Sequence, residues 1–507
     1  MINTTICCLL LFCIANTNSV CCTLGKITRL KTSNMYIDGQ WLECESTFDV
    51  HNPATGEVLG QVADGTAEHA TLAVEAAHRS FGDWSRTTAH HRSAILYRAW
   101  QIMLEQKSAL AALMTSEQGK PLKAASNEVQ YAADFLLWFA EESKRAYGET
   151  IPSARPDQRF IVQHQPVGVV AAITPWNYPV SMLTRKLAPA LAAGCTVVLK
   201  PAEATPLCAI AFYKILEQAG LPPGVVNLVT TSTPAPVGKV FCENPLVRKL
   251  TFTGSTAVGK MLSRDAAMQL KRVSMELGGH APFIVFDDAD PVHAAKGASL
   301  VKFLNTGQAC ICPNRIFVHK NILAEFLQTL TARIEKMQVG NGAKDGVAIG
   351  PLVNEQALSK IDKQVHDARD KGASVLCGGT RLEDGEYRDG FFYAPTVLSG
   401  VNDSMLIYRE ETFGPIAPVI PFDDDDDIIA MANDTSYGLA AYVYTKDLSR
   451  ALRTTEQLQF GIIGVNDINP TSASAPFGGM KESGLGREGA REGLMEYLET
   501  KLAGISV

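Results

Sequence analysis

The sequence has no excess of basic residues. Lys and Arg together number 46 and Asp and Glu 53, so the formal net charge is 46 − 53 = −7. Nucleic-acid binders normally carry a basic face, and peripheral membrane proteins use cationic patches. The charge balance therefore argues against both classes, and we expect neither a nucleic-acid nor a membrane partner.

A long hydrophobic run is also missing. The apolar stretch "ICCLLLFCIA", residues 6–15, has the length of a signal-peptide core and is too short to cross a bilayer as a helix. No Lys or Arg precedes it, because the first basic residue is Lys26. We therefore interpret residues 1–34 as a leader or a non-native extension, with the fold opening near Met35. A working secretory signal stays open as the alternative.

The cysteines do not form a disulfide pattern. Of the twelve, five lie within the first 22 residues and the other seven are scattered, which favours a reduced, intracellular protein. The stretch "NTGQACIC", residues 305–312, places Cys310 and Cys312 one residue apart. Structural metal sites usually need four ligands, often in two pairs, and no second pair or histidine cluster accompanies this one. We expect no metal, and a nucleophile or a redox switch remains.

Strands and helices alternate through most of the chain, and no internal repeat is visible. Residues 66–145 have a helical pattern, and residues 167–174 form a near-continuous apolar run typical of a strand buried on both faces. Further strands and helices alternate up to Gly279, where the pattern restarts and continues to about residue 478. This predicts an α/β fold with a doubly wound parallel sheet, followed by a second α/β lobe, with a cleft between them.

Two stretches in the first lobe could bind a dinucleotide. "FTGSTAVGK", residues 252–260, offers a tight turn at Gly254 and a helix cap at Ser255, where free N–H groups suit a pyrophosphate. "LKPAEATP" places Lys200 and Glu203 at the end of a strand, where a carboxylate can accept hydrogen bonds from a ribose and repel a 2′-phosphate. Taken alone, an ordinary capped turn and a surface ion pair explain the two stretches equally well.

Two further residues carry candidate chemistry. Glu276 in "MELGGH" ends a strand beside two glycines, and an apolar setting would raise its pKa toward that of a general base. A surface salt bridge is the alternative. A nucleophilic cysteine also needs an oxyanion partner, and Asn177 in "PWNYP" offers a side-chain amide in a rigid turn.

Seven stretches occur together in the order and spacing of the aldehyde dehydrogenase superfamily, which the chain resembles from about Met35 to its C-terminus. They are "PWNYP", "LKPAEATP", "FTGSTAVGK", "MELGGH", "NTGQAC", "EETFGP" and "PFGGMKESGLGREG". Within the superfamily the chain looks most like the succinate-semialdehyde dehydrogenases, through "SMLTRKLAPALAAGCTVVLKPAE", "NPLVRKLTFTGST" and "ELGGHAPFIVFDDAD".

The resemblance implies a domain plan. It has a Rossmann-type cofactor domain at residues 35–146 and 166–277, and an α/β catalytic domain at residues 278–478. Residues 147–165 and 479–507 would form a small oligomerisation hairpin, which implies a homodimer or homotetramer.

The resemblance also implies a mechanism. Cys310 would attack the aldehyde as a thiolate, while the Asn177 amide and the Cys310 N–H hold the oxyanion. Hydride transfer would leave a thioester, and Glu276 would activate the water that hydrolyses it. Cys312 would form a regulatory disulfide with the nucleophile, as in the succinate-semialdehyde dehydrogenases.

The implied cofactor is NAD, with NADP less favoured because of Glu203. Its expected ligands follow from the motif match: Thr174, Pro175, Trp176, Lys200, Glu203, Gly254, Ser255, Thr256, Gly259, Leu277, Glu411 and Phe413.

The implied substrate is a small aldehyde, with succinate semialdehyde first. Arg185 matches the family's carboxylate-binding arginine, and Thr471 stands where a serine usually helps. A second arginine is replaced by Leu304, so another short polar aldehyde, such as glycolaldehyde or lactaldehyde, stays open. A catalytically silent binding member is the rival from another class. The presence of Cys310, Glu276 and Asn177 together argues against it.

Overall fold

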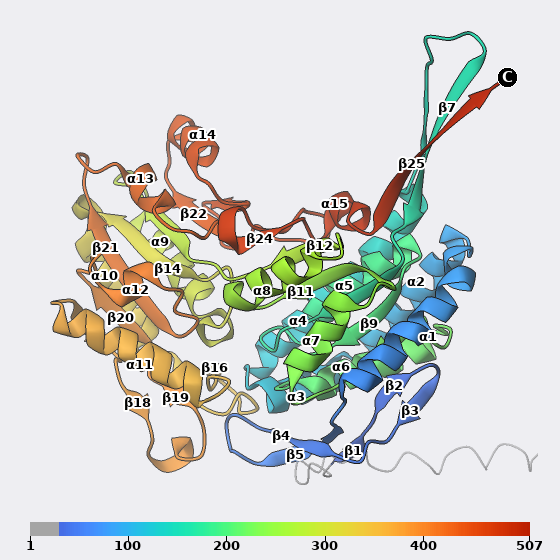
Figure 1. The fold of residues 1–507 in the computed structure, drawn as a ribbon. Helices are drawn as coiled ribbons and strands as arrows, with labels where there is room; N and C mark the ends of the chain where they lie inside the picture. Colours follow the sequence, from blue (N-terminus) through green and yellow to red (C-terminus); the bar gives the residue numbers. More distant parts are fainter. Residues whose placement is uncertain (1–29) are drawn as a thin grey trace, which may run out of the picture.

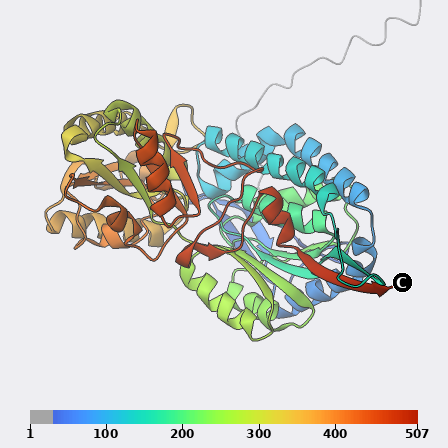
Figure 2. The same ribbon diagram turned by 90° about the horizontal axis from the view of Figure 1, so that it is seen from above.

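The computed structural model describes residues 30–507 and shows two α/β lobes with a hairpin that projects from the first (Figure 1). A view from above shows the same two lobes side by side (Figure 2). The predicted α/β architecture is confirmed: a lobe with a largely parallel sheet is followed by a second α/β lobe. Residues 1–29, with most of the predicted leader, lie outside the described residues.

The first lobe is built on a sheet with the order β24-β12-β11-β8-β9-β10-β2-β3. Its five central strands are parallel: β8 (Val169–Ile173), β9 (Thr196–Lys200), β10 (Val226–Leu228), β11 (Val247–Thr253) and β12 (Arg272–Glu276). The antiparallel edges are β2 (Met35–Ile37), β3 (Gln40–Leu42) and β24 (Gly484–Leu485). From β8 the chain winds one way through β9 and β10, then returns to the other side of β8 with β11. The reversal puts a topological switch point between β8 and β11, where open α/β sheets bind ligands.

Helices cover this sheet because its strands are apolar on both faces. Every residue of β8 and of β9 is buried. The covering helices are α1 (Ala67–Ser85), α2 (Ala89–Glu105), α3 (Lys107–Gln118), α4 (Leu122–Glu142), α5 (Ser181–Ala193), α6 (Pro206–Gln218), α7 (Pro234–Glu243) and α8 (Thr256–Ala267). A short η1 (Ser143–Arg145) extends α4. The continuous apolar runs in the sequence thus mark fully buried strands, as expected for a parallel sheet.

The second lobe is built on a sheet with the order β17-β20-β21-β14-β13-β22-β23. The strands are β13 (Ala281–Val285), β14 (Pro313–His319), β17 (Ser374–Cys377), β20 (Thr396–Ser399), β21 (Ile416–Phe422), β22 (Ala440–Tyr444) and β23 (Ile462–Val465). The larger helices around it are α9 (Pro291–Lys302), α10 (Lys320–Ile334), α11 (Glu355–Asp370) and α14 (Leu448–Gln457). Shorter elements are α12 (Leu406–Arg409), α13 (Ile428–Asn433), β15 (Gln338–Val339), β16 (Val347–Ile349), β18 (Arg381–Leu382) and β19 (Phe392–Tyr393).

The projecting hairpin is a three-stranded sheet of β6 (Glu149–Ile151), β7 (Gln158–Pro166) and the C-terminal β25 (Leu498–Ser506). Helix α15 (Ala490–Met495) precedes β25. At the other end of the described chain, β1 (Leu30–Ser33) pairs with β5 (Val58–Ala63), which also pairs with β4 (Thr47–His51). Strand β1 thus lies within residues 1–34, which we interpreted as a leader or an extension. No helix in residues 30–507 is long and apolar enough to cross a membrane.

Candidate active site

Cys310 lies on a tight loop between α9 and β14. Asn305, Thr306 and Gly307 all have positive φ angles, of 49°, 60° and 76°. Gly307 is required here, because a Cβ atom on it would lie 2.1 Å from the carbonyl oxygen of Gly414. The loop leaves Cys310 partly exposed and Cys312 buried, so only the first thiol is accessible to a substrate.

Glu276 is the last residue of β12 and is 4% exposed. Burial raises the pKa of its carboxyl group to about 7, and Glu488 adds to the rise, while Arg185 opposes it. Its Oε1 atom has no hydrogen-bond partner among the described residues. A carboxyl group with this pKa and a free oxygen suits a general base near neutral pH.

The Cys310 thiol and the Glu276 carboxyl group are neighbours. Burial raises the pKa of the thiol well above its usual value, and the charge of Glu276 raises it further. A Cβ atom on Gly279 would lie 2.2 Å from the carbonyl oxygen of Cys310, so a glycine is needed where the loop presses on the end of β12. The resting nucleophile is therefore a thiol, and the nearby carboxylate can accept its proton.

Asn177 joins the same site through the nucleophile loop. Its Nδ2 atom donates to the carbonyl oxygen of Gln308 at 3.1 Å, two residues before Cys310. The Asn305 amide donates to the carbonyl oxygens of both Asn177 and Gln308, at 2.9 and 3.2 Å. The structure thus brings the three predicted catalytic residues to one place, at the carboxyl ends of β8 and β12.

The predicted cofactor residues of the first lobe gather at the switch point. Thr174, Pro175 and Trp176 directly follow β8, and Lys200 ends β9. The Lys200 Nζ atom lies 2.8 Å from Glu203 Oε2, and the Glu203 side chain is 49% exposed. A half-exposed carboxylate beside a buried ammonium group leaves an acceptor directed toward solvent, as a ribose would need.

Helix α8 begins at the same edge of the sheet. Gly254 is followed by Ser255, which caps α8 as predicted and accepts a hydrogen bond from the Val258 N–H at 3.5 Å. Gly259 serves packing here, because a Cβ atom on it would lie 2.3 Å from Leu277. These two residues contact each other, and their cofactor contacts stay a prediction.

Residues of the second lobe meet residues of the first lobe beside the predicted cofactor positions. Glu411 Oε1 accepts a hydrogen bond from the Gly279 N–H at 2.9 Å, and Thr256 Oγ1 accepts one from the Gly278 N–H at 3.2 Å. The rings of Trp176 and Phe413 meet edge to face, with centroids 5.6 Å apart. The two lobes therefore meet around the predicted cofactor site.

Arg185 lies in α5 and is 2% exposed. Its Nε atom is 2.8 Å from Glu488 Oε2, and its guanidinium carbon is 3.8 Å from the centroid of the Phe477 ring. Its Nη2 atom is buried without a hydrogen-bond partner among the described residues. The sequence interpretation assigned no role to Glu488 or Phe477, although both lie in the quoted C-terminal motif.

The other two substrate positions are more exposed. Thr471 donates to Asn469 Oδ1 at 3.2 Å within its own loop, and no described contact joins it to Arg185. Leu304 is 39% exposed. Their substrate roles stay predictions.

Cys312 points away from the open part of the site. Its thiol donates to the carbonyl oxygen of Val301 at 3.3 Å, and burial raises its pKa to about 11. Cys310 and Cys312 are both free thiols. The regulatory disulfide stays a prediction that would need the loop to rearrange, and peptide mapping after mild peroxide would detect it.

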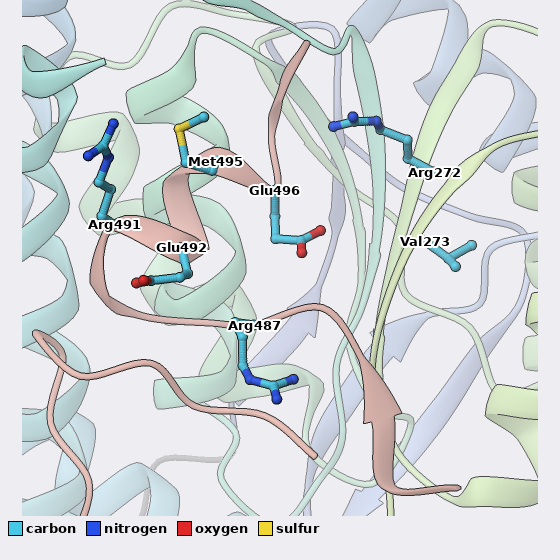
Figure 3. A pocket seen from close by; sticks show the side chains of 7 residues that line it. All are labelled: Arg272, Val273, Arg487, Arg491, Glu492, Met495 and Glu496. Atoms are coloured by element: carbon cyan, nitrogen blue, oxygen red, sulfur yellow. The ribbon is translucent and has the colours of Figure 1, made fainter. Parts of the chain in front are cut away.

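A separate pocket of about 670 Å³ lies at the opposite end of β12 from Glu276 (Figure 3). Its lining comes from β12 and the segment around α15: Arg272, Val273, Arg487, Arg491, Glu492, Met495 and Glu496. It is therefore distinct from the catalytic cleft. Within residues 30–507, no group of three or more His, Cys, Asp or Glu side chains could hold a metal ion.

Comparisons with known proteins agree with this fold. Residues 41–503 match the aldehyde dehydrogenase family. The chain is 49% identical to a glutarate-semialdehyde dehydrogenase of Pseudomonas putida, over 95% of this chain and 99% of that protein. It is also 49% identical to a succinate-semialdehyde dehydrogenase [NADP(+)] of Escherichia coli, over 93% and 98%.

A solved structure of an E. coli NADP-dependent enzyme is 48% identical, with a TM-score of 0.92 over 94% of this chain and 98% of the other. The order of motifs, the fold and the relatives agree over nearly the whole described chain. The chain belongs to the aldehyde dehydrogenase family.

Proposed function

We propose that this protein oxidises a short aldehyde bearing a carboxylate, with succinate semialdehyde first, and that it uses NAD as the hydride acceptor. The observation that carries the substrate class is the unpaired, buried Nη2 atom of Arg185. Both relatives reported above are named for semialdehydes of dicarboxylic acids, which carry one carboxylate each.

The chain's own residues account for each proton and bond of the reaction. Glu276 accepts the proton of the Cys310 thiol, and the thiolate adds to the carbonyl carbon. The oxygen becomes an oxyanion held by the Asn177 amide and the Cys310 N–H. The bound nicotinamide supplies the hydride acceptor. Glu276 then releases the thiol proton to solvent. Water attacks the thioester that hydride transfer leaves, and Glu276 accepts the proton of that water. Collapse of the adduct expels the Cys310 thiolate and the carboxylic acid, which ionises to the carboxylate product.

The switch point between β8 and β11 offers groups that suit a dinucleotide. It combines the N-terminus of α8, the small turn at Gly254 and the half-exposed Glu203 carboxylate. We propose that Glu203 accepts hydrogen bonds from the adenosine ribose and disfavours a 2′-phosphate. The E. coli relative carries NADP(+) in its name, and Lys200 is the residue here that could favour it.

The cofactor preference is testable at Glu203. We expect the wild type to favour NAD over NADP by about tenfold or more in kcat/KM, since about 1.4 kcal/mol suffices for that factor. Glu203→Ala should remove most of the preference, because it removes the repulsion and frees Lys200. Glu243→Ala is a matched control, since Glu243 is also exposed and paired with a lysine. A wild type that uses NADP as well as NAD would contradict the proposal.

Glu488 supports the proposed role of Arg185. Its two oxygens meet Arg185 Nε and Lys186 Nζ, at 2.8 and 2.6 Å. The ion pair with Nε orients the guanidinium and leaves Nη2 unpaired. Burial opposes the charge of Arg185, but the charge of Glu488 raises its pKa, and Tyr131, Glu276 and Cys310 add smaller contributions. Arg185 is thus placed beside the reacting groups with an unused donor.

The substrate is testable at Arg185. A hydrogen bond to a charged group contributes about 1.5–3 kcal/mol, or about ten- to more than a hundredfold in kcat/KM. We expect Arg185→Ala to lower kcat/KM for succinate semialdehyde by that factor and to affect butanal much less. Leu304→Arg should sharpen the preference for the carboxylate. An equal loss for both substrates would show that Arg185 only pairs with Glu488.

The equal-loss result would favour the second candidate, a dehydrogenase of a hydroxy aldehyde such as glycolaldehyde or lactaldehyde. The observation that favours it is Leu304, an exposed apolar side chain where the resemblance implies a second arginine. A panel of aldehydes assayed with the wild type would rank the two candidates directly.

We also infer a homo-oligomer assembled through the projecting hairpin. Strand β25 is an edge of its sheet, and Leu502, Ile505 and Val507 are exposed. An edge strand with exposed apolar residues is a natural pairing surface. Sedimentation velocity would distinguish dimer from tetramer, and a monomer would contradict the inference.

A further inference from the structure

The segment that carries Asn177 has no regular secondary structure, because β8 ends at Ile173 and α5 begins at Ser181. Its position depends on side chains from elsewhere. The carbonyl oxygen of Asn177 accepts two of them, Lys120 Nζ at 2.8 Å and Asn305 Nδ2 at 2.9 Å. The donor from Asn305 ties the segment to the nucleophile loop, and the donor from Lys120 ties it to the helices behind.

Lys120 is almost fully buried and forms an ion pair with Glu128. Its ammonium group also lies 4.1 Å from the centroid of the Tyr178 ring. The backbone beside Lys120 is tightly constrained, because Gly119 has a φ angle of 91° and a Cβ atom on it would lie 2.6 Å from Pro351. The ammonium group is therefore held at one place relative to Asn177.

Glu128 holds the other end of the same segment. Its Oε2 atom pairs with Lys120, and its Oε1 atom accepts hydrogen bonds from the N–H groups of Val180 and Ser181, at 3.0 and 3.1 Å. One buried ion pair thus contacts residue 177 through its ammonium group and residues 180–181 through its carboxylate. Burying an ion pair carries a large desolvation penalty, and this pair directs its other side-chain hydrogen bonds to the segment of Asn177.

We propose that Lys120 and Glu128 are positioning residues that hold the Asn177 amide where the oxyanion forms, an inference that rests on the proposed function. With the carbonyl oxygen of Asn177 fixed from behind, its side chain can reach the Gln308 carbonyl and keep its remaining N–H for the substrate. The ion pair itself does not touch the reacting atoms. It acts through the peptide group of Asn177.

Loss of this support should lower kcat rather than raise KM. The amide binds the oxyanion, which is absent from the bound aldehyde, so its displacement weakens the transition state alone. Removing an oxyanion donor costs about 10²- to 10³-fold in kcat. A misplaced donor should cost less, so we expect Lys120→Met to lower kcat by about 10- to 100-fold. KM should change by no more than about threefold, because the aldehyde is bound elsewhere.

The test is a double-mutant cycle between Lys120 and Asn177. Steady-state kcat and KM are measured for the wild type, Lys120→Met, Asn177→Ala and the double variant, with thermal unfolding of each. If Lys120 acts through Asn177, then Lys120→Met in the Asn177→Ala background should cost less than about twofold in kcat. Equal losses in both backgrounds would overturn the proposal, whatever the effect on thermal unfolding.

A matched control separates positioning from general stability. Lys249 is also fully buried and lies 3.2 Å from a glutamate, Glu496, which lines the separate pocket described above. Lys249→Met should lower the unfolding temperature without a drop in kcat at a temperature where the variant is folded. A tenfold drop in its kcat would mean that any buried lysine has this effect, and would count against the proposal.

Lys120→Met leaves the Glu128 carboxylate unpaired, and the variant could fail to fold. The double variant Lys120→Met/Glu128→Gln removes both charges and keeps an acceptor for Val180 and Ser181. It should reproduce the fall in kcat, and wild-type kcat in this variant would overturn the proposal. Asn177→Ala alone separates the two hypotheses. If it has full activity, the proposed oxyanion role fails, whereas a low activity with a normal Lys120→Met refutes only the positioning role.

Discussion

Cys310→Ala is expected to lower kcat for aldehyde oxidation by about 10⁴-fold or more, because the covalent route is lost with the nucleophile. Cys310 carries the partly exposed thiol next to Glu276. It lies on the loop that accepts a hydrogen bond from the Asn177 amide. The measurement is reduction of NAD with succinate semialdehyde, together with cofactor binding followed by fluorescence. Cofactor binding should survive, since the switch-point crevice does not include this side chain.

Cys312→Ala is the matched control for Cys310→Ala. It lies in the same loop, but its thiol is buried against the Val301 carbonyl, so most of the activity should remain. Near-wild-type turnover in purified Cys310→Ala would refute the mechanism.

Glu276→Gln is expected to lower steady-state kcat by about 10²- to 10⁴-fold, the usual contribution of a general base. The amide is close in size and shape to the carboxyl group and cannot accept a proton. In the wild type, the pKa of about 7 means that the group is protonated and inactive as a base below pH 7, and active above it. The wild-type kcat should therefore rise through about pH 7, and the variant should lose this limb of the pH profile.

A second measurement separates the effect of Glu276→Gln on thioester hydrolysis from its effect on deprotonation of the Cys310 thiol. Hydroxylamine attacks thioesters without a base, so it should accelerate turnover of the variant more than that of the wild type. Glu482→Gln is a suitable control, because Glu482 forms an exposed ion pair with Lys260. A pH profile that is unchanged in Glu276→Gln would assign the limb to another group and contradict the role of the base.

Local patterns in the chain were sufficient to predict the elements that carry the site. The apolar runs of β8 and β9 predict strands buried on both faces, and both are buried along their whole length. Ser255 caps α8, as the sequence predicts. These features depend on near neighbours in the chain, so spacing and residue type reveal them.

The family, the order of strands and helices, and the candidate nucleophile, base and oxyanion donor could all be predicted from the sequence. The side chains that these residues contact could not be predicted, because they come from distant parts of the chain. Glu488 lies 303 positions from Arg185, and Lys120 lies 57 from Asn177. Such partners are brought together by the sheet and its packed helices, and no local pattern encodes their distance. The same holds for the pKa of Glu276, which depends on burial at a strand end that forms only when both lobes close around it.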